Sequence, residues 1–300
     1  MQSESTRPSI FMALVLSLLC PGFGHLYVGR WRRGLTLFLC LLLFAPAMVL
    51  LTMSGPTTPL LVLMLGLVAG ELLLQLYAVV DGVRVAVVDR NACGKPMSGR
   101  LLGLLVAIGL CYPLGSVWVL RSNVVQGYEI AAASMSPNLN AQDVVLVNRL
   151  QHNMGRDLQR GDLVVFRAPG QRDQAYAKRV VGLPGDTVEW VKGDLWVNGN
   201  PLIREPVPAP SSSPVDDAAN LEAFAEENAG RRYTVWRSTL AAASAEPVTV
   251  PTDTCYVAGD HRSNSKDSRA FGCVPVGDVL GLVDYVVKPA EGWRRFGACR

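Results

Sequence analysis

The amino-acid sequence predicts a multi-span α-helical membrane anchor followed by a mainly β domain. Half of the 300 residues are hydrophobic, which is a high fraction for a soluble protein. The charges are uneven, because residues 1–120 hold only 12 of the 53 charged side chains. From Val144 on, short β-rich runs separated by Gly and Asp replace the long apolar runs. We therefore expect a membrane domain over residues 1–122 and a second domain over residues 123–300.

Three apolar segments of the first domain have the length of a bilayer crossing, which needs roughly 20 mostly apolar residues. They cover residues 35–53, 57–80 and 101–120. A fourth apolar stretch, residues 10–28, is interrupted by Pro21-Gly22-Phe23-Gly24-His25. This interruption indicates either a kinked crossing or a re-entrant hairpin, so the anchor has three or four apolar segments.

The basic residues between these segments predict their orientation. Loops rich in Lys and Arg stay on the cytoplasmic side of a membrane. Three arginines precede the segment at 35–53, and four basic residues separate the second and third long segments: Arg84, Arg90, Lys95 and Arg100. The third segment then exits outward, and we expect everything after Arg121 to be extracytoplasmic.

The second domain shows the pattern of an all-β fold, either a twisted sandwich of antiparallel sheets or a partly closed barrel. Lys192-Gly193-Asp194 is typical of a hairpin turn, and a helical period is visible only at Asn220–Asn228. The expected strands are Val144–Val147, Leu163–Phe166, Tyr176–Val181, Val188–Val191, Leu195–Val197, Tyr233–Trp236, Cys255–Ala258 and Val279–Val287.

A segment rich in Pro, Ser, Ala and acidic residues interrupts this pattern at about residues 205–231. Few of its residues can be buried in a core. We expect a surface insertion that is mobile at least up to Asp217.

Ser134 lies just beyond the last apolar segment and is a candidate nucleophile that needs a base. The chain has three histidines, and the neighbouring Asp260-His261 pair gives no support to a Ser-His-Asp site, since adjacent side chains point in different directions. A neutral lysine can serve instead. Lys178 shares one strand face with Tyr176 and Val180. If that face is the inner one, Arg179 points outward. Burial lowers a lysine pKa by up to ~3–5 units, whereas an edge-strand lysine in solvent is the alternative.

Four ordered blocks resemble those of bacterial signal peptidase I, the leader peptidase family of Ser-Lys membrane serine proteases. The resemblance extends over roughly Glu129–Val287. The blocks are Ser134-Met135-Ser136-Pro137-Asn138-Leu139, Arg160-Gly161-Asp162-Leu163-Val164-Val165-Phe166, Lys178-Arg179-Val180-Val181-Gly182-Leu183-Pro184-Gly185-Asp186, and Gly259-Asp260-His261-Arg262-Ser263-Asn264-Ser265-Lys266-Asp267-Ser268-Arg269.

This resemblance implies an endopeptidase that removes signal peptides from exported preproteins after small residues. It would be a multi-pass protein of the bacterial inner membrane with its catalytic domain on the periplasmic face. Ser134 is the implied nucleophile, Lys178 the implied general base, and Ser265 the residue that orients the lysine. The implied supports of the active-site loop are Asp260, Arg262, Asp267 and Arg269.

Further expectations concern the segment around the nucleophile. Small residues there would let an extended substrate approach the backbone, and the expected substrate-binding residues are Ala131, Ala132, Ala133 and Met135. Some family members have a serine two residues before the nucleophile that donates to the oxyanion. Ala132 occupies this position, so the Ser134 N–H would have to serve. Asn138 stands where the family commonly has Thr.

The remaining composition limits the partners. Neither half of the chain is basic enough to suggest nucleic-acid binding. None of the cysteines shows a zinc spacing with histidine, so we expect no metal or cofactor, and the expected partners are preproteins and the lipid bilayer. Cys255 and Cys273 flank the block that begins at Gly259, and a disulfide between them is a hypothesis. Two other functions stay open: a specialised peptidase for one secretion or conjugation substrate, and a non-catalytic membrane scaffold.

Overall fold

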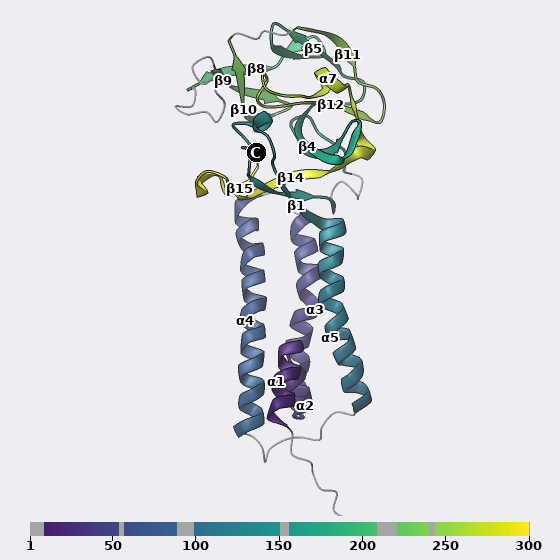
Figure 1. Cartoon of the computed structure of the whole chain (residues 1–300), viewed down its shortest axis with the longest axis vertical. Coiled ribbons are helices and arrows are strands. Elements are labelled where there is room, and N and C mark those ends of the chain that lie inside the picture. The colour runs from purple at the N-terminus through teal and green to yellow at the C-terminus, as the bar shows by residue number, and fades with distance from the viewer. Residues whose placement is uncertain are drawn as a thin grey trace, which may run out of the picture. The chain divides into compact units, whose positions relative to one another are not determined.

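The computed structural model describes residues 9–53, 57–88, 99–150, 156–208, 221–239 and 244–299. The chain divides between Ser122 and Asn123 into a helical unit and a β unit, and Figure 1 labels many of their elements. The α-helices of the helical unit are α1 (Ile10–Leu19), α2 (Phe23–Tyr27), α3 (Trp31–Met53), α4 (Thr58–Val88) and α5 (Gly99–Val119), and the β unit contains the short α7 (Ser268–Phe271). Of these, α3, α4 and α5 contain the three long apolar segments and have the length and composition to cross a membrane.

The interrupted segment at residues 10–28 forms two short helices. α1 has 10 residues and is therefore about 15 Å long, half the thickness of a bilayer core. The turn before α2 requires Gly22, whose φ is +94° and whose added Cβ would lie 2.1 Å from a backbone oxygen of Gly34. On α2, the fully buried His25 has its Nε2 2.9 Å from Oδ2 of Asp81 on α4. This histidine thus packs within the helical unit.

The β unit contains three sheets whose strand pairs are all antiparallel within the part of the chain that the structure describes. The largest has the order β1-β2-β14-β3-β4-β12-β13, with β15 beside β14; the others are β10-β9-β8 and β11-β5-β6-β7. The sheets do not close into a barrel among the described residues.

The strands of the large sheet are β1 (Val125–Glu129), β2 (Val144–Asn148), β3 (Leu163–Ala168), β4 (Gln171–Gly182), β12 (Thr254–Ala258), β13 (Val274–Pro275), β14 (Val279–Lys288) and β15 (Gly297–Ala298). The smaller sheets contain β5 (Thr187–Val191), β6 (Asp194–Val197), β7 (Asn200–Pro201), β8 (Ile203–Val207), β9 (Leu221–Asn228), β10 (Arg231–Ser238) and β11 (Ala245–Thr249). Each of the eight strands expected from the sequence lies within one of these observed strands, some of which extend further at their ends.

The large sheet is buried on both faces, which explains the continuous apolar run of β3. Successive strand residues point to opposite faces. Leu163 and Val165 therefore join one core cluster, while Val164 and Phe166 join another. In the neighbouring sheet, the expected hairpin turn joins β5 to β6, and Lys192 and Gly193 have φ of 50° and 82°. Positive φ at both central residues is what a two-residue hairpin turn of type I′ requires.

The helix expected at Asn220–Asn228 is wrong, because Leu221–Asn228 forms strand β9. Ala and Glu favour helices in isolation, but the strand alternates between buried and less buried positions over Leu221–Phe224. It also pairs with β10 along its whole length and with β8 on the other side. Tertiary pairing thus overrides local propensity. The flanks of the expected insertion are therefore sheet, and residues 209–220 lie outside the described part of the chain.

Candidate active site

A cleft of about 550 Å³ in the β unit is bordered by Ser134 and Lys178. Its walls are largely apolar and come from β1, the segment after it, β3 and β4. The remaining lining residues are Tyr128, Glu129, Ile130, Ala131, Ala132, Met135, Val165, Gln174, Ala175, Tyr176, Ala177, Asn264 and Lys266.

The serine lies on a single 3₁₀ turn, Ala133–Met135, that follows an extended residue, Ala132, with φ −138° and ψ 155°. The next side chain, Met135, is fully buried in a core cluster of the large sheet. The backbone oxygen of Ser134 accepts a hydrogen bond from the His261 N–H at 3.1 Å. The turn is therefore anchored on both sides, and the half-buried serine faces the cleft.

Lys178 reaches this serine from β4. Its side chain is only 4% exposed, its Nζ lies 2.6 Å from Ser134 Oγ, and it donates to the Ala177 carbonyl at 3.1 Å. Burial lowers the pKa of Lys178 from 10.5 to about 8, against the nearby carboxylates of Asp267 and Asp260, which raise it. The solvent-exposed alternative for this lysine is thus excluded. A serine hydroxyl beside an amine of such pKa can lose its proton to that amine.

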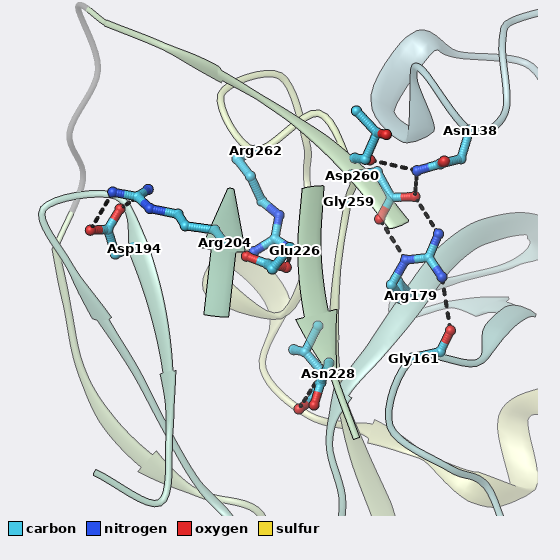
Figure 2. Close-up of polar contacts among 12 residues, drawn as sticks. Asn138, Gly161, Arg179, Asp194, Arg204, Glu226, Asn228, Gly259, Asp260 and Arg262 are labelled. Atoms are coloured by element: carbon cyan, nitrogen blue, oxygen red, sulfur yellow. Dashed lines mark hydrogen bonds and ion pairs between the residues drawn. The ribbon is translucent and has the colours of Figure 1, made fainter. Parts of the chain in front are cut away.

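Arg179 does not point outward, contrary to the expectation from strand alternation. Its side chain is 1% exposed and forms an ion pair with the carboxylate of Asp260. Nε and one terminal nitrogen donate to Asp260 at 2.8 and 2.7 Å, and the other terminal nitrogen donates to the Gly161 carbonyl at 2.8 Å. Both faces of β4 are covered by protein at this position, so the residue next to Lys178 is held by a buried ion pair (Figure 2).

Asn138 joins the same carboxylate to the segment that carries Ser134. Its amide donates to Asp260 Oδ2 at 2.7 Å and to the Thr234 carbonyl on β10 at 2.6 Å (Figure 2). Asp260 therefore contacts both the segment that carries Ser134 and the residue after Lys178. The sequence indicated Asn138 only as a departure from the family block, and its spacing gave no sign of these partners.

Asp267 and Arg269 form the ion pair expected within the loop, at 2.8 Å. The carboxylate also accepts from the Gly259 N–H at 2.9 Å. Burial by itself raises the pKa of Asp267, but the Arg269 guanidinium and this N–H outweigh it and hold the pKa below its ordinary value.

The other two loop charges have partners outside the loop. Asp260 pairs with Arg179, and Arg262 pairs with Glu226 on β9, with both side chains of the latter pair at most 5% exposed (Figure 2). Sequence reasoning missed Glu226 because its segment was assigned to a helix in a surface insertion.

Ser265 makes no hydrogen bond to Lys178 in the structure. Its buried Oγ has no partner at hydrogen-bond geometry among the described residues, although it lies near Asp267. It packs against Gly259, where an added Cβ would lie 2.2 Å from this oxygen. The orienting role of Ser265 stays a prediction.

The expected substrate-binding residues are only partly gathered at the cleft. Ala131, Ala132 and Met135 line it, whereas Ala133 is not among its lining residues. Sequence reasoning did not single out the rim residues Glu129, Gln174 and Lys266, because nothing in their local pattern distinguishes them from solvated polar residues.

The histidines and cysteines give no further chemistry at this site. His261 is buried with its ring edge-on to Trp236, and its Nδ1 accepts from the Asn264 N–H at 3.1 Å; His152 lies outside the described residues. Cys255 and Cys273 are free thiols in the structure, so the hypothesised disulfide is not formed. No group of three or more His, Cys, Asp or Glu residues that could hold a metal ion occurs in the described ranges.

Comparison with known proteins adds a family relation. The family model described as "Signal peptidase, peptidase S26" matches residues 102–288. The signal peptidase I of Pseudomonas aeruginosa is 34% identical over 183 residues, which cover 56% of this chain and 63% of that protein. The signal peptidase I of Bacillus caldolyticus is 33% identical over 170 residues, or 56% and 82% of the two chains. A crystal structure of a signal peptidase I from Enterococcus faecalis has 31% identity, covering 42% of this chain and 97% of that one with a TM-score of 0.27.

Proposed function

Because the chain belongs to the signal peptidase, peptidase S26 family, we propose that it is a membrane-anchored serine endopeptidase that removes N-terminal signal peptides from exported preproteins. The observation that carries this proposal is the 2.6 Å separation between Ser134 Oγ and a buried Lys178 Nζ. The match covers 63% of the length of the Pseudomonas relative, so the assignment of preproteins as substrates is part of this proposal.

In the proposed reaction, Lys178 is the general base and Ser134 the nucleophile. The neutral amine takes the Oγ proton as Oγ attacks the carbonyl carbon of the scissile bond. The resulting ammonium protonates the leaving amine as the C–N bond breaks, which leaves an ester on Ser134. The amine then takes a proton from water as the water oxygen attacks the ester carbon, and the ammonium returns this proton to Ser134 Oγ as the ester C–O bond breaks.

Two features of the nucleophile segment fit this reaction. Ala132 has no hydroxyl to stabilise the oxyanion, so backbone N–H groups must do so, including that of Ser134; one such donor is worth about 3–4 kcal/mol of barrier. The side chains of Ala131 and Ala132 are small, which lets a substrate strand approach closely and favours small substrate residues.

The membrane places this site near its substrate. Ser134 follows the end of α5 at Val119 by 15 residues, a tether of at most about 50 Å. Basic residues before α3 and α5 favour a cytoplasmic side for those ends, so we place the β unit on the periplasmic face of the bacterial inner membrane. A leader that is still embedded by its apolar core presents its cleavage site at that surface.

The test uses the full chain in detergent micelles with a preprotein that carries small residues one and three positions before the cleavage site. Wild type is compared with Ser134→Ala, Lys178→Met and the control Lys288→Met, which alters an exposed lysine at the end of β14. We expect cleavage by wild type and the control only, with a loss of at least 10³-fold in the two site variants, in the range of other nucleophile and base removals.

Other outcomes favour the alternatives. If Ser134→Ala or Lys178→Met retains cleavage, the proposed chemistry is wrong. If folded wild type cuts none of a panel of preproteins, a specialised peptidase or a non-catalytic scaffold is the better account.

A further inference from the structure

The cleft carries two charged side chains that the proposed reaction does not use. Apart from Lys178, the charged lining residues are Glu129 and Lys266, and both are exposed. Among the residues that the structure describes, neither side chain has a hydrogen bond or an ion pair. Each charge is therefore available to a bound peptide, and the remaining walls are neutral and largely apolar.

Lys266 belongs to the end of the cleft that holds the serine. It follows Ser265, whose Oγ packs on Gly259, and an added Cβ at Gly259 would lie 2.6 Å from the Ser134 backbone oxygen. Gly259 thus lies against both Ser265 and Ser134, so Lys266, the neighbour of Ser265, is near the turn that carries the serine.

Glu129 belongs to the other end. It is the last residue of β1 and precedes Ser134 by five residues. Extended backbone advances about 3.3 Å per residue, so the carboxylate can stand roughly 15 Å from the nucleophile along the segment that contains Ala131 and Ala132.

The positions of Lys266 and Glu129 imply opposite charge preferences for the two halves of a substrate. In the proposed function, on which this inference rests, the leader side of the peptide lies along the segment between Glu129 and Ser134. The residues after the scissile bond begin at Ser134, near which Lys266 lies. We propose that this cleft is charge-selective: Lys266 favours an acidic side chain in the first two positions after the bond, and Glu129 disfavours one about four or five positions before it.

The size of the effect follows from the exposure of both groups. An ion pair at a solvent-exposed rim contributes about 0.2–1 kcal/mol, which corresponds to roughly a 1.5- to fivefold change in kcat/KM. Because the Debye length shortens to about 3 Å at 1 M salt, the charge preference should fade as salt is added. A preference due to packing would persist.

The experiment measures kcat/KM for the full chain in micelles at pH 9, where Lys178 is mostly neutral. Preproteins carry Asp or the nearly isosteric Asn at single positions from six before to three after the bond. We expect wild type and Lys266→Arg to prefer Asp after the bond, Lys266→Gln to lose this preference, and Lys266→Glu to reverse it. Glu129→Gln should relieve the penalty on the leader side only, and the control Lys288→Glu should change neither.

The outcomes separate this inference from the proposed function. If the Asn substrates are cut but Asp and Asn never differ, or if the Asp preference survives in Lys266→Glu, the charge selection is wrong while the peptidase function stands. If no substrate is cut by folded wild type, both fall together.

Discussion

The buried amine of Lys178 predicts the pH dependence of cleavage. Burial lowers its pKa from 10.5 to about 8, and only the neutral amine can act as a base. About one tenth of the molecules carry the neutral form at pH 7 and about one hundredth at pH 6. We therefore expect kcat/KM to rise about tenfold per pH unit below 8 and to level off above it.

The same pKa predicts a stability effect of opposite sign. The lowered pKa corresponds to about 3 kcal/mol by which the folded state disfavours the ammonium relative to the unfolded chain. This cost is fully present below pH 8 and is relieved as pH rises from 8 to 10.5, because the unfolded state binds more protons in that window. Lys178→Met removes the cost together with two hydrogen bonds worth about 1 kcal/mol each. At pH 7 the free energy of unfolding of Lys178→Met should therefore exceed that of wild type by about 1 kcal/mol.

Two measurements on the full chain in detergent check this reasoning. The first is the kcat/KM profile of wild type between pH 6 and 10. The second is thermal unfolding of wild type, Lys178→Met and the control Lys288→Met at pH 7 and pH 10. The advantage of Lys178→Met should vanish and reverse at pH 10, where the wild-type amine is neutral. A kcat/KM that still rises about tenfold per pH unit from pH 8 to 10, as expected for a lysine of ordinary pKa, or a stability advantage of Lys178→Met that does not change with pH, would refute the burial argument.

Two further predictions concern the contacts that hold the site together. Asn138→Ala removes two hydrogen bonds, one to the buried Asp260 carboxylate and one to the β10 backbone. We therefore expect a free energy of unfolding about 1–3 kcal/mol lower and a lower kcat with little change in KM. Unchanged unfolding and kinetics would contradict this prediction, and Asn138→Thr shows whether a hydroxyl can replace the amide. Glu226→Gln leaves the guanidinium of Arg262 buried without its counter-charge, which should cost about 3–5 kcal/mol in thermal unfolding. A loss below about 1 kcal/mol would show that this pair is solvated rather than buried.

The sequence predicted the elements whose signals are local. Apolar length located α3, α4 and α5, strand alternation and turn residues located the sheet, and the Lys192-Gly193 hairpin followed from its turn chemistry. The strand face that contains Tyr176, Lys178 and Val180 allowed either a buried or an exposed lysine. The structure decides for burial, because residues of β3 and β12 join Val180 in one core cluster.

The errors arose where distant segments decide the outcome. Leu221–Asn228 has helix-forming residues, yet pairing with β8 and β10 makes it a strand. Alternation along β4 placed Arg179 in solvent, but a strand in the middle of a doubly covered sheet has no solvent face. Neither the partner of Arg262 nor the role of Asn138 could follow from spacing, since these contacts join residues 36 and 122 positions apart.

The position of Asp260 connects these observations into one physical argument. Its carboxylate is bound by Arg179, next to the proposed base, and by Asn138, four residues after the proposed nucleophile. The charge that orders the two segments also raises the pKa of Lys178 and so opposes the neutral amine that the proposed reaction needs. Burial must outweigh it, and the pairing with Arg179 helps by compensating the carboxylate locally. The buried ion pair therefore allows a fixed geometry and a low lysine pKa to coexist in one site.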